Sequence, residues 1–474
     1  MALPIDRLNE RFEGEFEFKR KVFKVPYTLP GDLVQFQLRF RGPKHERFKV
    51  LHIEAAESYP PEVALADPFC AYHGRCGGCR AQHLAYDFQL KTKCNPVREK
   101  MRAQTGVEPE LLPAPAIGGY RNRMDFVVNG SDCGLRPVGD FANFVDIENC
   151  GIQRDGANAA LALCRRLLAL PECAGAAHQR DDHSGALKYI TIRQGAGSGA
   201  IILTVHAAAR ELPAYIVFRD GLQSELAKVR EDSESPLFEY SLIESSTEAV
   251  EAEVSNPPGG RTLLGRDALR EELGGLQFDV PYDAFFQPNP PAFDRLLEAG
   301  RPWIRAELEG APVGDAASDG AGESVLIDLY SGAGVLSAVI ADWFPGAFQR
   351  IRGYESTASA VERAPANFRS AGVTEPAIDF QAVDLLAPPA DFLKDPARLI
   401  VLDPPRAGLS PAVREALLRQ RPAPAMLYIS CNPYSQLRDL EELADAYEAK
   451  HAVLADCFPH TPHLEQAVWL VRKD

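Results

Sequence analysis

Hydrophobic and polar residues alternate in short runs over the first 60 positions of the chain. The segment KVFKVPYTLPGDLVQFQLRF, residues 21–40, shows this alternation on both sides of a Pro-Gly-Asp turn, and RFKVLHIEA, residues 47–55, shows it again. A period of two predicts strands that bury one face. We therefore predict a small β-barrel of the OB type over residues 1–60.

Residues 61–274 mix two kinds of pattern. The segment 85–104 is amphipathic with the period of a helix, as are NAALALCRRLLAL and GLQSELAKV further on. Strand-like apolar runs, MDFVVNG, LKYITIRQG and AIILTVHAA, occur in the same region. This mixture predicts an α+β domain.

From about residue 275 onward, the apolar runs become continuous and each ends in polar or glycine residues. Four of them, VLIDLYSGAG, RGYES, LIVLDPPRAG and LYISCNP, are separated by helical stretches. Such strands, alternating with helices, are typical of a doubly wound parallel sheet. We predict a Rossmann-like α/β domain over residues 275–474, with residues 310–324 forming a mobile loop before its first strand.

Composition limits the class of protein. The chain has 474 residues, of which 46% are hydrophobic and 25% charged, which is an ordinary globular balance for a protein of several domains. We find no secretion signal and no apolar run that could span a bilayer, and we therefore expect a cytoplasmic protein without membrane contact. The ten cysteines are then expected to bind metal or act in catalysis, because disulfides are rare in a reducing compartment.

The net charge of −15 argues against a generic nucleic-acid coat. The charge is uneven, however, because residues 1–130 contain 20 basic and 16 acidic side chains, whereas the remainder contains 31 and 50. A mildly basic front part on an acidic body is consistent with local contact with RNA. Surface charge that serves only solubility is the alternative.

Three of the cysteines crowd into FCAYHGRCGGCRAQH, residues 69–83, with the spacing C-x5-C-x2-C, and a fourth follows far downstream in DIENCGI. The four that could share one metal centre are Cys70, Cys76, Cys79 and Cys150. Four thiolates suit zinc and an iron–sulfur cluster equally well. A structural zinc site that uses His73 or His83 in place of Cys150 is a further alternative.

The segment VLIDLYSGAGVLS, residues 325–337, predicts a strand that runs into a glycine loop and a helix. Gly332 and Gly334 would let a ligand approach the backbone, but Ser337 replaces the third glycine of the dinucleotide fingerprint. The next strand ends at Glu355, where a carboxylate can accept hydrogen bonds from ribose hydroxyls. This layout favours a nucleoside cofactor such as S-adenosylmethionine.

Two later strands end in residues with candidate chemistry, Asp403 in LIVLDPPRAG and Cys431 in LYISCNP. Because ligands bind outside the carboxyl ends of parallel strands, both should face the cofactor crevice. Near the C-terminus, VLADCFPHTPHLEQAVWLVRK predicts a hairpin whose turn carries Glu465, with His460 and His463 as rival bases. The alternatives are a buried structural cysteine and an exposed loop acid.

A thiolate, a carboxylate and a methyl donor together fit methylation of carbon 5 of a uracil ring. Carbon 5 is a poor nucleophile until a thiolate adds to carbon 6 and generates an enolate. After methylation, a base removes the remaining proton on carbon 5 and the thiol is expelled. Methylation of an exocyclic amine needs no cysteine, and an aromatic residue tends to follow Asp-Pro-Pro in those enzymes, where this chain has Arg406.

These motifs resemble those of the S-adenosylmethionine-dependent RNA uracil-C5 methyltransferases, which make 5-methyluridine in transfer and ribosomal RNA. The resemblance covers most of the chain and rests on C-x5-CGGC-x2-QH, YRNRMDF, FFQPN, DLYSGAG, DPPRAG, SCNP and HTPHLE. Its iron–sulfur subset is the most similar. The resemblance implies a TRAM-like OB β-barrel at residues 1–60, a central α+β iron–sulfur domain at 61–274 and a class I methyltransferase domain at 275–474.

The resemblance also implies roles for individual residues. Cys431 is expected to be the nucleophile and Glu465 the general base. The residues expected to line the cofactor and uracil pocket are Gln287, Tyr330, Glu355, Asp384 and Asp403. The expected ligands of a structural [4Fe-4S] cluster are Cys70, Cys76, Cys79 and Cys150. For Phe285 and Phe286 of FFQPN we expect core packing.

A base within folded RNA must leave its stack to reach a buried nucleophile, so we expect the substrate to be a loop uridine of transfer or ribosomal RNA. The expected phosphate contacts, with solvated surface charge as the alternative, are Arg121, Arg123, Lys91 and Lys93. No protein partner is implied, and we expect a monomer. Two other functions remain open: an RNA cytosine-C5 methyltransferase, and a non-catalytic RNA-binding protein with a structural zinc site.

Overall fold

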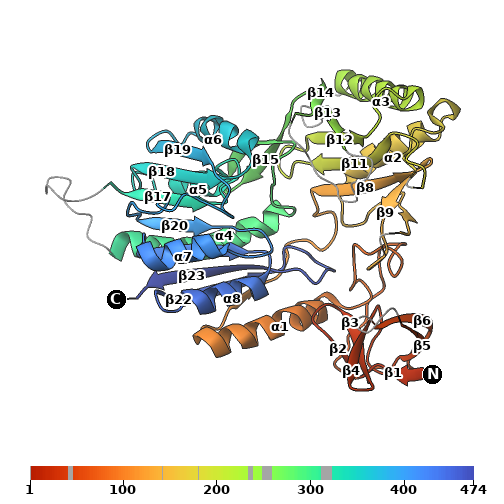
Figure 1. Ribbon diagram of the computed structural model, residues 1–474, viewed down its shortest axis with the longest axis horizontal. Helices are drawn as coiled ribbons and strands as arrows, with labels where there is room; N and C mark the ends of the chain where they lie inside the picture. The colour runs from red at the N-terminus through yellow and green to blue at the C-terminus, as the bar shows by residue number, and fades with distance from the viewer. Residues whose placement is uncertain are drawn as a thin grey trace. The chain divides into compact units, whose positions relative to one another are not determined.

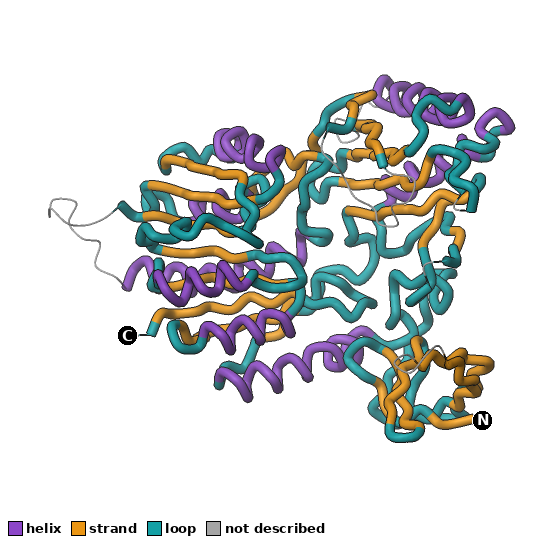
Figure 2. The backbone as a smooth tube through the Cα atoms, viewed as in Figure 1, coloured by secondary structure: helices purple, strands orange, loops and turns teal. Residues whose placement is uncertain are grey.

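The computed structural model describes residues 2–40, 46–140, 142–179, 181–232, 239–247, 259–310 and 323–473 (Figures 1 and 2). The loop predicted to be mobile, residues 310–324, lies almost wholly outside this part of the chain. The chain divides into two compact units. Unit 1 comprises Met1–Lys100, Arg136–Val145 and Phe458–His463, and unit 2 comprises Met101–Leu135, Asp146–Cys457 and Leu464–Asp474.

Six short strands form the first part of unit 1. They are β1 (Ala2–Pro4), β2 (Arg7–Leu8), β3 (Glu13–Phe18), β4 (Lys21–Pro26), β5 (Leu33–Phe40) and β6 (Glu46–Glu54). They pair antiparallel in two three-stranded sheets, β1-β5-β6 and β2-β3-β4. One apolar core joins the sheets, in which the rings of Phe16 and Phe23 stack with centroids 5.3 Å apart. The predicted alternating strands are confirmed, whereas the TRAM assignment stays a prediction.

The predicted helix at 85–104 is present as α1 (Tyr86–Thr105). Unit 2 then contains a seven-stranded sheet in the order β10-β9-β8-β11-β12-β13-β14. Its strands are β8 (Arg123–Asn129), β9 (Asp132–Leu135), β10 (Val145–Asp146), β11 (Leu187–Gln194), β12 (Ile201–Ala207), β13 (Tyr240–Ser246) and β14 (Arg261–Leu264). The helical elements between them are α2 (Asp155–Leu168), η1 (Pro171–Cys173) and α3 (Pro213–Asp232). The strand and helix runs predicted in this region are confirmed.

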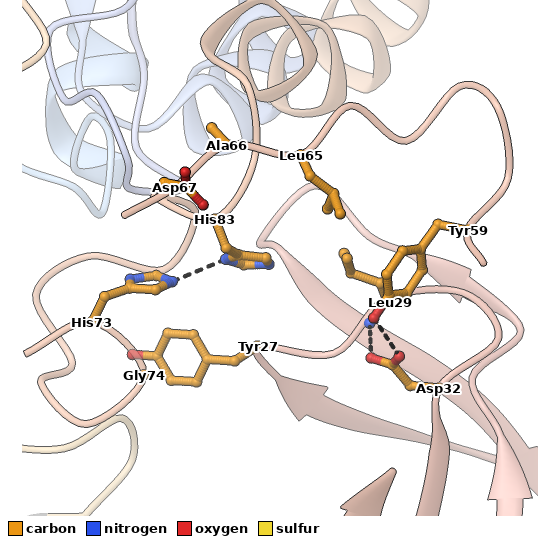
Figure 3. Close-up of a pocket in the computed structure, with 10 residues that line it drawn as sticks. All are labelled: Tyr27, Leu29, Asp32, Tyr59, Leu65, Ala66, Asp67, His73, Gly74 and His83. Atoms are coloured by element: carbon orange, nitrogen blue, oxygen red, sulfur yellow. Dashed lines mark hydrogen bonds between the residues drawn. The ribbon is translucent and has the colours of Figure 1, made fainter. Parts of the chain in front are cut away.

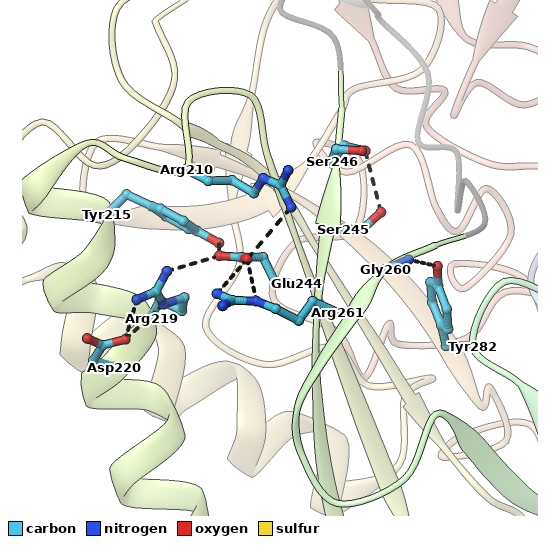
Figure 4. Close-up of polar contacts among 10 residues, drawn as sticks. All are labelled: Arg210, Tyr215, Arg219, Asp220, Glu244, Ser245, Ser246, Gly260, Arg261 and Tyr282. Atoms are coloured by element: carbon cyan, nitrogen blue, oxygen red, sulfur yellow. Dashed lines mark hydrogen bonds and ion pairs between the residues drawn. The ribbon is translucent and has the colours of Figure 1, made fainter.

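A buried carboxylate ties the edge of this sheet to α3. Glu244 of β13 is 1% exposed and accepts hydrogen bonds from Tyr215 Oη at 3.0 Å and Arg219 Nη1 at 3.3 Å, both on α3 (Figure 4). Arg261 of β14 donates to its other oxygen at 2.9 Å. Because a buried charge is tolerated only when paired, this cluster stabilises an acidic residue within the sheet.

The hairpin β15 (Ala268–Leu273) and β16 (Leu276–Pro281) leads into an eight-stranded sheet in the order β19-β18-β17-β20-β21-β23-β22-β7. Its strands are β7 (Glu110–Leu112), β17 (Val325–Leu329), β18 (Arg350–Glu355), β19 (Ala377–Ala382), β20 (Leu399–Leu402), β21 (Ala425–Ser430), β22 (Tyr447–Ala455) and β23 (Glu465–Arg472). The first five in spatial order are parallel, and β23 runs antiparallel between β21 and β22.

Helices follow the strands of this sheet along the chain. They are α4 (Pro290–Gly310), α5 (Val335–Trp343), α6 (Ala358–Ser370), α7 (Pro411–Gln420) and α8 (Pro433–Leu443). Side chains of α7 and α8, such as Val413 and Leu440, share one core with Ile327 of β17 and Ile400 of β20. The doubly wound α/β domain predicted from the apolar runs is therefore confirmed, because strands buried on both faces need helices to cover them. No helix in the described part of the chain is long and apolar enough to cross a membrane.

Candidate active site

Five of the residues singled out in the sequence lie at one edge of the eight-stranded sheet. Tyr330, Asp403 and Cys431 directly follow β17, β20 and β21, and Glu355 is the last residue of β18. Because these strands are parallel, their carboxyl ends share an edge. Since β23 runs antiparallel to β21, its first residue, Glu465, lies at the same edge.

The β21–β23 ladder brings the expected nucleophile and base together. Its last pair is Ser430 with Gln466, and Cys431 and Glu465 are the next residues on the two strands. Opposite residues of an antiparallel pair project toward the same face. Their electrostatic interaction agrees, since Glu465 is the largest cause after burial that raises the pKa of the Cys431 thiol to about 12. The two groups predicted from separate motifs are therefore neighbours.

Glu465 lies at the start of a strand and not in the turn where the sequence predicted it, and it is only 1% exposed. Its Oε2 atom has no hydrogen-bond partner among the described residues. Burial, and then the nearby Asp403, raise its pKa well above the usual value, while Arg406 acts in the opposite direction. The exposed-loop alternative is thus wrong, and a buried carboxyl with a vacant acceptor faces the thiol.

Asp403 is held by a residue from another part of the chain. Gln287 Nε2 donates a hydrogen bond to Asp403 Oδ2 at 2.9 Å. Burial, followed by the neighbouring Asp328, raises the pKa of Asp403 to about 7, and the bond from Gln287 lowers it. Asp328, the fourth residue of β17, is fully buried, and burial raises its pKa to about 7 as well. Two adjacent carboxyls therefore titrate near neutral pH.

The glycine loop after β17 is shaped for a ligand. Gly332 and Gly334 have φ angles of +53° and +76°, which glycine adopts without strain. A Cβ added at Gly332 would meet nothing within 4 Å, so the space above this backbone is open. Gly332 N–H donates to Glu355 Oε2 at 3.1 Å, and Thr357 N–H donates to Oε1 at 2.8 Å. These bonds fix the Glu355 carboxylate beside the open loop and leave lone pairs for a further donor.

The YRNRMDF motif supports Gln287 from the seven-stranded sheet. Asn122, which is 2% exposed, donates through Nδ2 to the Gln287 carbonyl at 3.0 Å and to Glu271 Oε1 at 3.0 Å. Asn122 N–H also donates to Pro288 O at 2.9 Å. The motif therefore acts on the pocket through the backbone that carries Gln287.

Arg193 of β11 holds the chain just before FFQPN. It is 2% exposed, and its Nη1 donates to the carbonyls of Pro281 and Ala284 at 3.2 Å each. Of the two phenylalanines that follow, Phe286 is 8% exposed, as expected for a core residue. The expectation for Phe285 is wrong, because its side chain is 66% exposed. Phe285 is thus the exposed member of the motif, whereas Phe286 and Gln287 are both buried.

The other two residues expected in the cofactor and uracil pocket take different positions. Tyr330, half-buried with φ +66°, has its pKa raised to about 12, chiefly by burial. Asp384 lies two residues beyond β19 and is exposed, and its Oδ1 accepts a hydrogen bond from Leu386 N at 2.9 Å. Because β19 is parallel to β18, Asp384 lies at the same edge of the sheet as Glu355.

No sequence pattern pointed to the residue that fixes the DPPRAG loop. Asp439 of α8 is 2% exposed and accepts hydrogen bonds from Leu409 N at 2.8 Å, Tyr428 Oη at 2.5 Å and Arg414 Nη1 at 3.0 Å. It therefore stabilises the segment that carries Arg406. Among the described residues, Arg406 is the cation that lowers the pKa of both Cys431 and Glu465. An acidic residue in an amphipathic helix is usually solvated, so the position of Asp439 in the sequence did not indicate that it is buried and holds this loop.

The expected metal ligands are divided between the two units. Cys70, Cys76 and Cys79 belong to a loop of unit 1 and are partly exposed, while Cys150 belongs to unit 2 and is 8% exposed. Gly78 N–H donates to Cys76 Sγ at 3.4 Å. Within the described residues, no group of three or more His, Cys, Asp or Glu side chains is placed to hold a metal ion. The iron–sulfur cluster therefore stays a prediction.

The two histidines of the alternative zinc site contact each other. They line a pocket of about 500 Å³ in unit 1, where His73 Nε2 lies 2.9 Å from His83 Nδ1 (Figure 3). Burial, and then His73, lower the pKa of His83 to about 4. Each imidazole thus uses one nitrogen on the other ring, and no cysteine lines this pocket.

Known proteins resemble this chain over its whole length. Residues 393–473 match the model of a family described as tRNA (Uracil-5-)-methyltransferase. An uncharacterized RNA methyltransferase of Leptospira interrogans is 30% identical over 99% of this chain and 96% of its own. A tRNA (uracil(54)-C(5))-methyltransferase of Pyrococcus horikoshii is 28% identical over 94% of this chain and 95% of its own. The crystal structure of Pyrococcus abyssi tRNA (uracil-54, C5)-methyltransferase in complex with S-adenosyl-L-homocysteine has the same fold, with a TM-score of 0.69 over 99% of this chain and 100% of that one, at 24% identity.

A parallel sheet with an inserted antiparallel strand and a glycine loop after β17 defines a class I methyltransferase fold. The similarity over nearly the full chain goes further. The chain belongs to the RNA uracil-C5 methyltransferase family and is an S-adenosylmethionine-dependent RNA uridine-C5 methyltransferase.

Proposed function

We propose that this enzyme methylates carbon 5 of a loop uridine through a covalent bond between Cys431 and carbon 6, with Glu465 as the general base. The observation that carries the proposal is the adjacency of the two residues beyond the last pair of the β21–β23 ladder. A nucleophile and a base on neighbouring strands can act on adjacent atoms of one small ring. A methyltransferase that uses no covalent intermediate would have no need for this pair.

The residues proposed to hold the co-substrate and the uracil are Gln287, Tyr330, Glu355, Asp384 and Asp403. Support comes from the open backbone at Gly332 and from the fixed Glu355 carboxylate beside it, which can accept bonds from a ribose. Gln287 and Asp403 form a hydrogen-bonded pair that can present both donors and acceptors to a pyrimidine edge. S-adenosylmethionine, when bound, supplies an electrophilic methyl group on a sulfonium.

In the first step, the Cys431 sulfur donates an electron pair to carbon 6, and the electrons of the C5–C6 double bond move onto carbon 5 and the 4-carbonyl oxygen. Carbon 5 then forms its bond to the methyl group while the bond from that group to the sulfonium sulfur breaks, and the electron pair of the broken bond stays on the sulfur of the departing S-adenosylhomocysteine. In the last step, the Glu465 carboxylate takes the proton from carbon 5, the C5–C6 double bond forms again, and the sulfur leaves carbon 6 with its electron pair. The net change replaces one hydrogen by a methyl group and releases one proton.

Protonation controls when this sequence can begin. Burial and the neighbouring Glu465 raise the pKa of the Cys431 thiol to about 12, so this thiol holds its proton in the protein alone at neutral pH, and burial raises the pKa of Glu465 well above its usual value. A cationic sulfonium favours the ionised form of nearby acids. We propose that binding of the positively charged co-substrate lowers these pKa values and prepares the thiol and the carboxyl for reaction.

The RNA substrate is proposed from chemistry and from relatives. A uridine in a loop costs least to unstack, roughly a few kcal/mol or less. The Pyrococcus relatives are named tRNA methyltransferases, which favours transfer RNA over ribosomal RNA as the substrate. Incubation with labelled S-adenosylmethionine and separate transfer and ribosomal RNA pools, followed by a nucleoside digest, identifies both the RNA and the base. Labelled 5-methylcytidine in the digest would favour the cytosine alternative.

A second part of the proposal is a structural [4Fe-4S] cluster on Cys70, Cys76, Cys79 and Cys150. Its support is the thiolate donor set and the Gly78 N–H that donates to Cys76 Sγ, the kind of bond that stabilises a ligated thiolate. The reaction above does not involve the cluster. Iron and sulfide assays on anaerobically purified protein test it, and stoichiometric zinc in place of iron would contradict it.

The covalent step has a direct test with RNA that contains 5-fluorouridine. Fluorine on carbon 5 cannot be removed as a proton, so the enzyme should stay bonded to the RNA after methyl transfer. We expect an adduct that survives denaturing electrophoresis with the wild-type protein and none with Cys431→Ala. Cys457→Ala, which changes a buried cysteine outside the proposed pair, should still form it. An adduct with Cys431→Ala would assign the nucleophile to another residue.

A further inference from the structure

The loop that joins β22 to β23 is built around one ammonium group. Lys93 of α1 is 1% exposed, and its Nζ donates hydrogen bonds to the carbonyls of Phe458 at 3.3 Å, Thr461 at 3.1 Å and His463 at 3.2 Å. An ammonium has three N–H donors, and each of these three carbonyls of the loop lies within hydrogen-bond distance of it. The expectation that Lys93 contacts RNA phosphates is therefore wrong, because its charge is buried among carbonyl oxygens of its own chain.

A second residue on the same face of α1 holds the middle of the loop. Gln89, four residues before Lys93, accepts a hydrogen bond from His460 N–H through Oε1 at 3.1 Å, and its Nε2 lies 3.2 Å from His460 Nδ1. His460 has a φ angle of +66°, which is unfavourable for a residue with a side chain. The His460 carbonyl in turn accepts from Arg80 N–H at 2.7 Å. The surroundings thus hold the loop in a conformation that it would not keep alone.

The loop is continuous with the proposed base. Residues 458–463 belong to unit 1 together with Lys93 and Gln89, whereas β22 and β23, which the loop connects, belong to unit 2. Glu465 is only two residues beyond His463, the last carbonyl that Lys93 holds. A change in the path of residues 461–463 therefore alters the backbone that begins β23 at Glu465.

We propose that Lys93 is a positioning residue for proton removal from carbon 5: it fixes the 458–463 loop by its three carbonyl contacts, and the loop fixes the Glu465 carboxyl. This inference rests on the proposed function. It predicts a specific defect, because addition of Cys431 to carbon 6 depends on β21 and not on the loop. Without Lys93, the RNA adduct should form normally and resolve slowly.

The test uses Lys93→Met, which keeps the length and apolar stem of the side chain and removes the three donors. With RNA that contains 5-fluorouridine, where no proton is removed, the variant should form the adduct at the wild-type rate. With ordinary RNA, kcat should fall roughly 10- to 100-fold, since a shift of about 1 Å in a reacting group can cost about 100-fold, while KM changes little. The methylated RNA–protein adduct should accumulate during turnover. Lys100→Met, at an exposed position of the same helix, is the matched control and should behave as wild type.

Each other result is decisive. Wild-type turnover by a folded Lys93→Met protein, or equal loss of adduct formation and turnover, would overturn the positioning role. Failure of the wild-type protein itself to form the fluorouridine adduct would instead overturn the proposed function. If Lys93→Met does not fold, Gln89→Met keeps the Lys93 contacts, removes the two His460 contacts together with the hydrogen bond from Gln89 Nε2 to the Leu84 carbonyl, and should show the same pattern to a smaller degree. A Gln89→Met protein with normal kcat and no accumulated adduct would then refute the proposal.

Discussion

Cys431 and Glu465 are the first residues beyond the last paired positions, Ser430 and Gln466, of two antiparallel strands. The two residues are separated by more than 30 positions in sequence and belong to unrelated motifs. Strand pairing alone makes them neighbours, and burial raises the pKa of both groups.

Glu465→Gln keeps the size of the side chain and removes its ability to accept a proton. We expect kcat to fall roughly 100- to 10,000-fold, the usual range for loss of a general base. The methylated adduct should accumulate on ordinary RNA, visible as a slow band in denaturing electrophoresis. Normal turnover by this variant would place the base elsewhere.

Gln287→Ala removes the hydrogen bond that lowers the pKa of Asp403. The pKa of Asp403 should then rise above its value of about 7, because the burial and the neighbouring carboxyl that raise it remain. The acidic limb of the pH profile of kcat/KM should move to higher pH. Asp403→Asn is the matched control, since a variant without this ionisation should lack the acidic limb. An unchanged pH profile in Gln287→Ala would show that Gln287 does not influence the ionisation of Asp403.

Asp328 should make the protein less stable as the pH rises. Its pKa is about 7 in the folded state and about 4 when unfolded, so the folded state holds more protons between these values. The stabilisation is fully present below about pH 4 and is lost as the pH rises through 7. Its contribution to the slope is at most about 1.4 kcal/mol per pH unit. In urea unfolding, Asp328→Asn should weaken the pH dependence of the free energy of unfolding. An equally steep pH dependence in the variant would show that Asp328 is not the group that causes it.

Arg193→Met should weaken both the fold and the pocket. Burial lowers the pKa of Arg193 to about 10, and its loss leaves the carbonyls of residues 281–284 without their donor and removes one of the two cations, with Arg154, that act on the buried Glu271. We expect the free energy of unfolding to fall by roughly 3–5 kcal/mol, as for other broken buried pairs. KM should rise because Gln287 follows these carbonyls. The double variant Arg193→Met/Glu271→Gln should regain part of the stability, and strictly additive losses would show that the two groups do not interact.

Sequence patterns predicted those helices and strands whose formation depends mainly on the pattern of apolar residues along the chain. The helix α1 was visible from the period of its apolar residues, and the strands β11 and β12 were visible as short runs rich in β-branched residues that are buried along their whole length. The placement of Asp403 and Cys431 was also visible, since polar residues directly after buried parallel strands must lie at one edge of the sheet. Burial of individual side chains was less visible, as Phe285 and Lys93 show: the first is exposed beside a buried twin, and the second is a buried cation.

By itself, the sequence determined the order of strands and helices, the edge of the sheet that carries the chemistry, and the residue types available there. Only the tertiary structure decided that Glu465 is buried beside Cys431, that Asn122 and Arg193 hold the FFQPN backbone, and that Lys93 holds the loop before β23. The physical reason is that periodicity is a local property of the chain. Pairing between strands and hydrogen bonds to backbone carbonyls join positions far apart in sequence, and any residue can supply a carbonyl, so no residue pattern records these contacts.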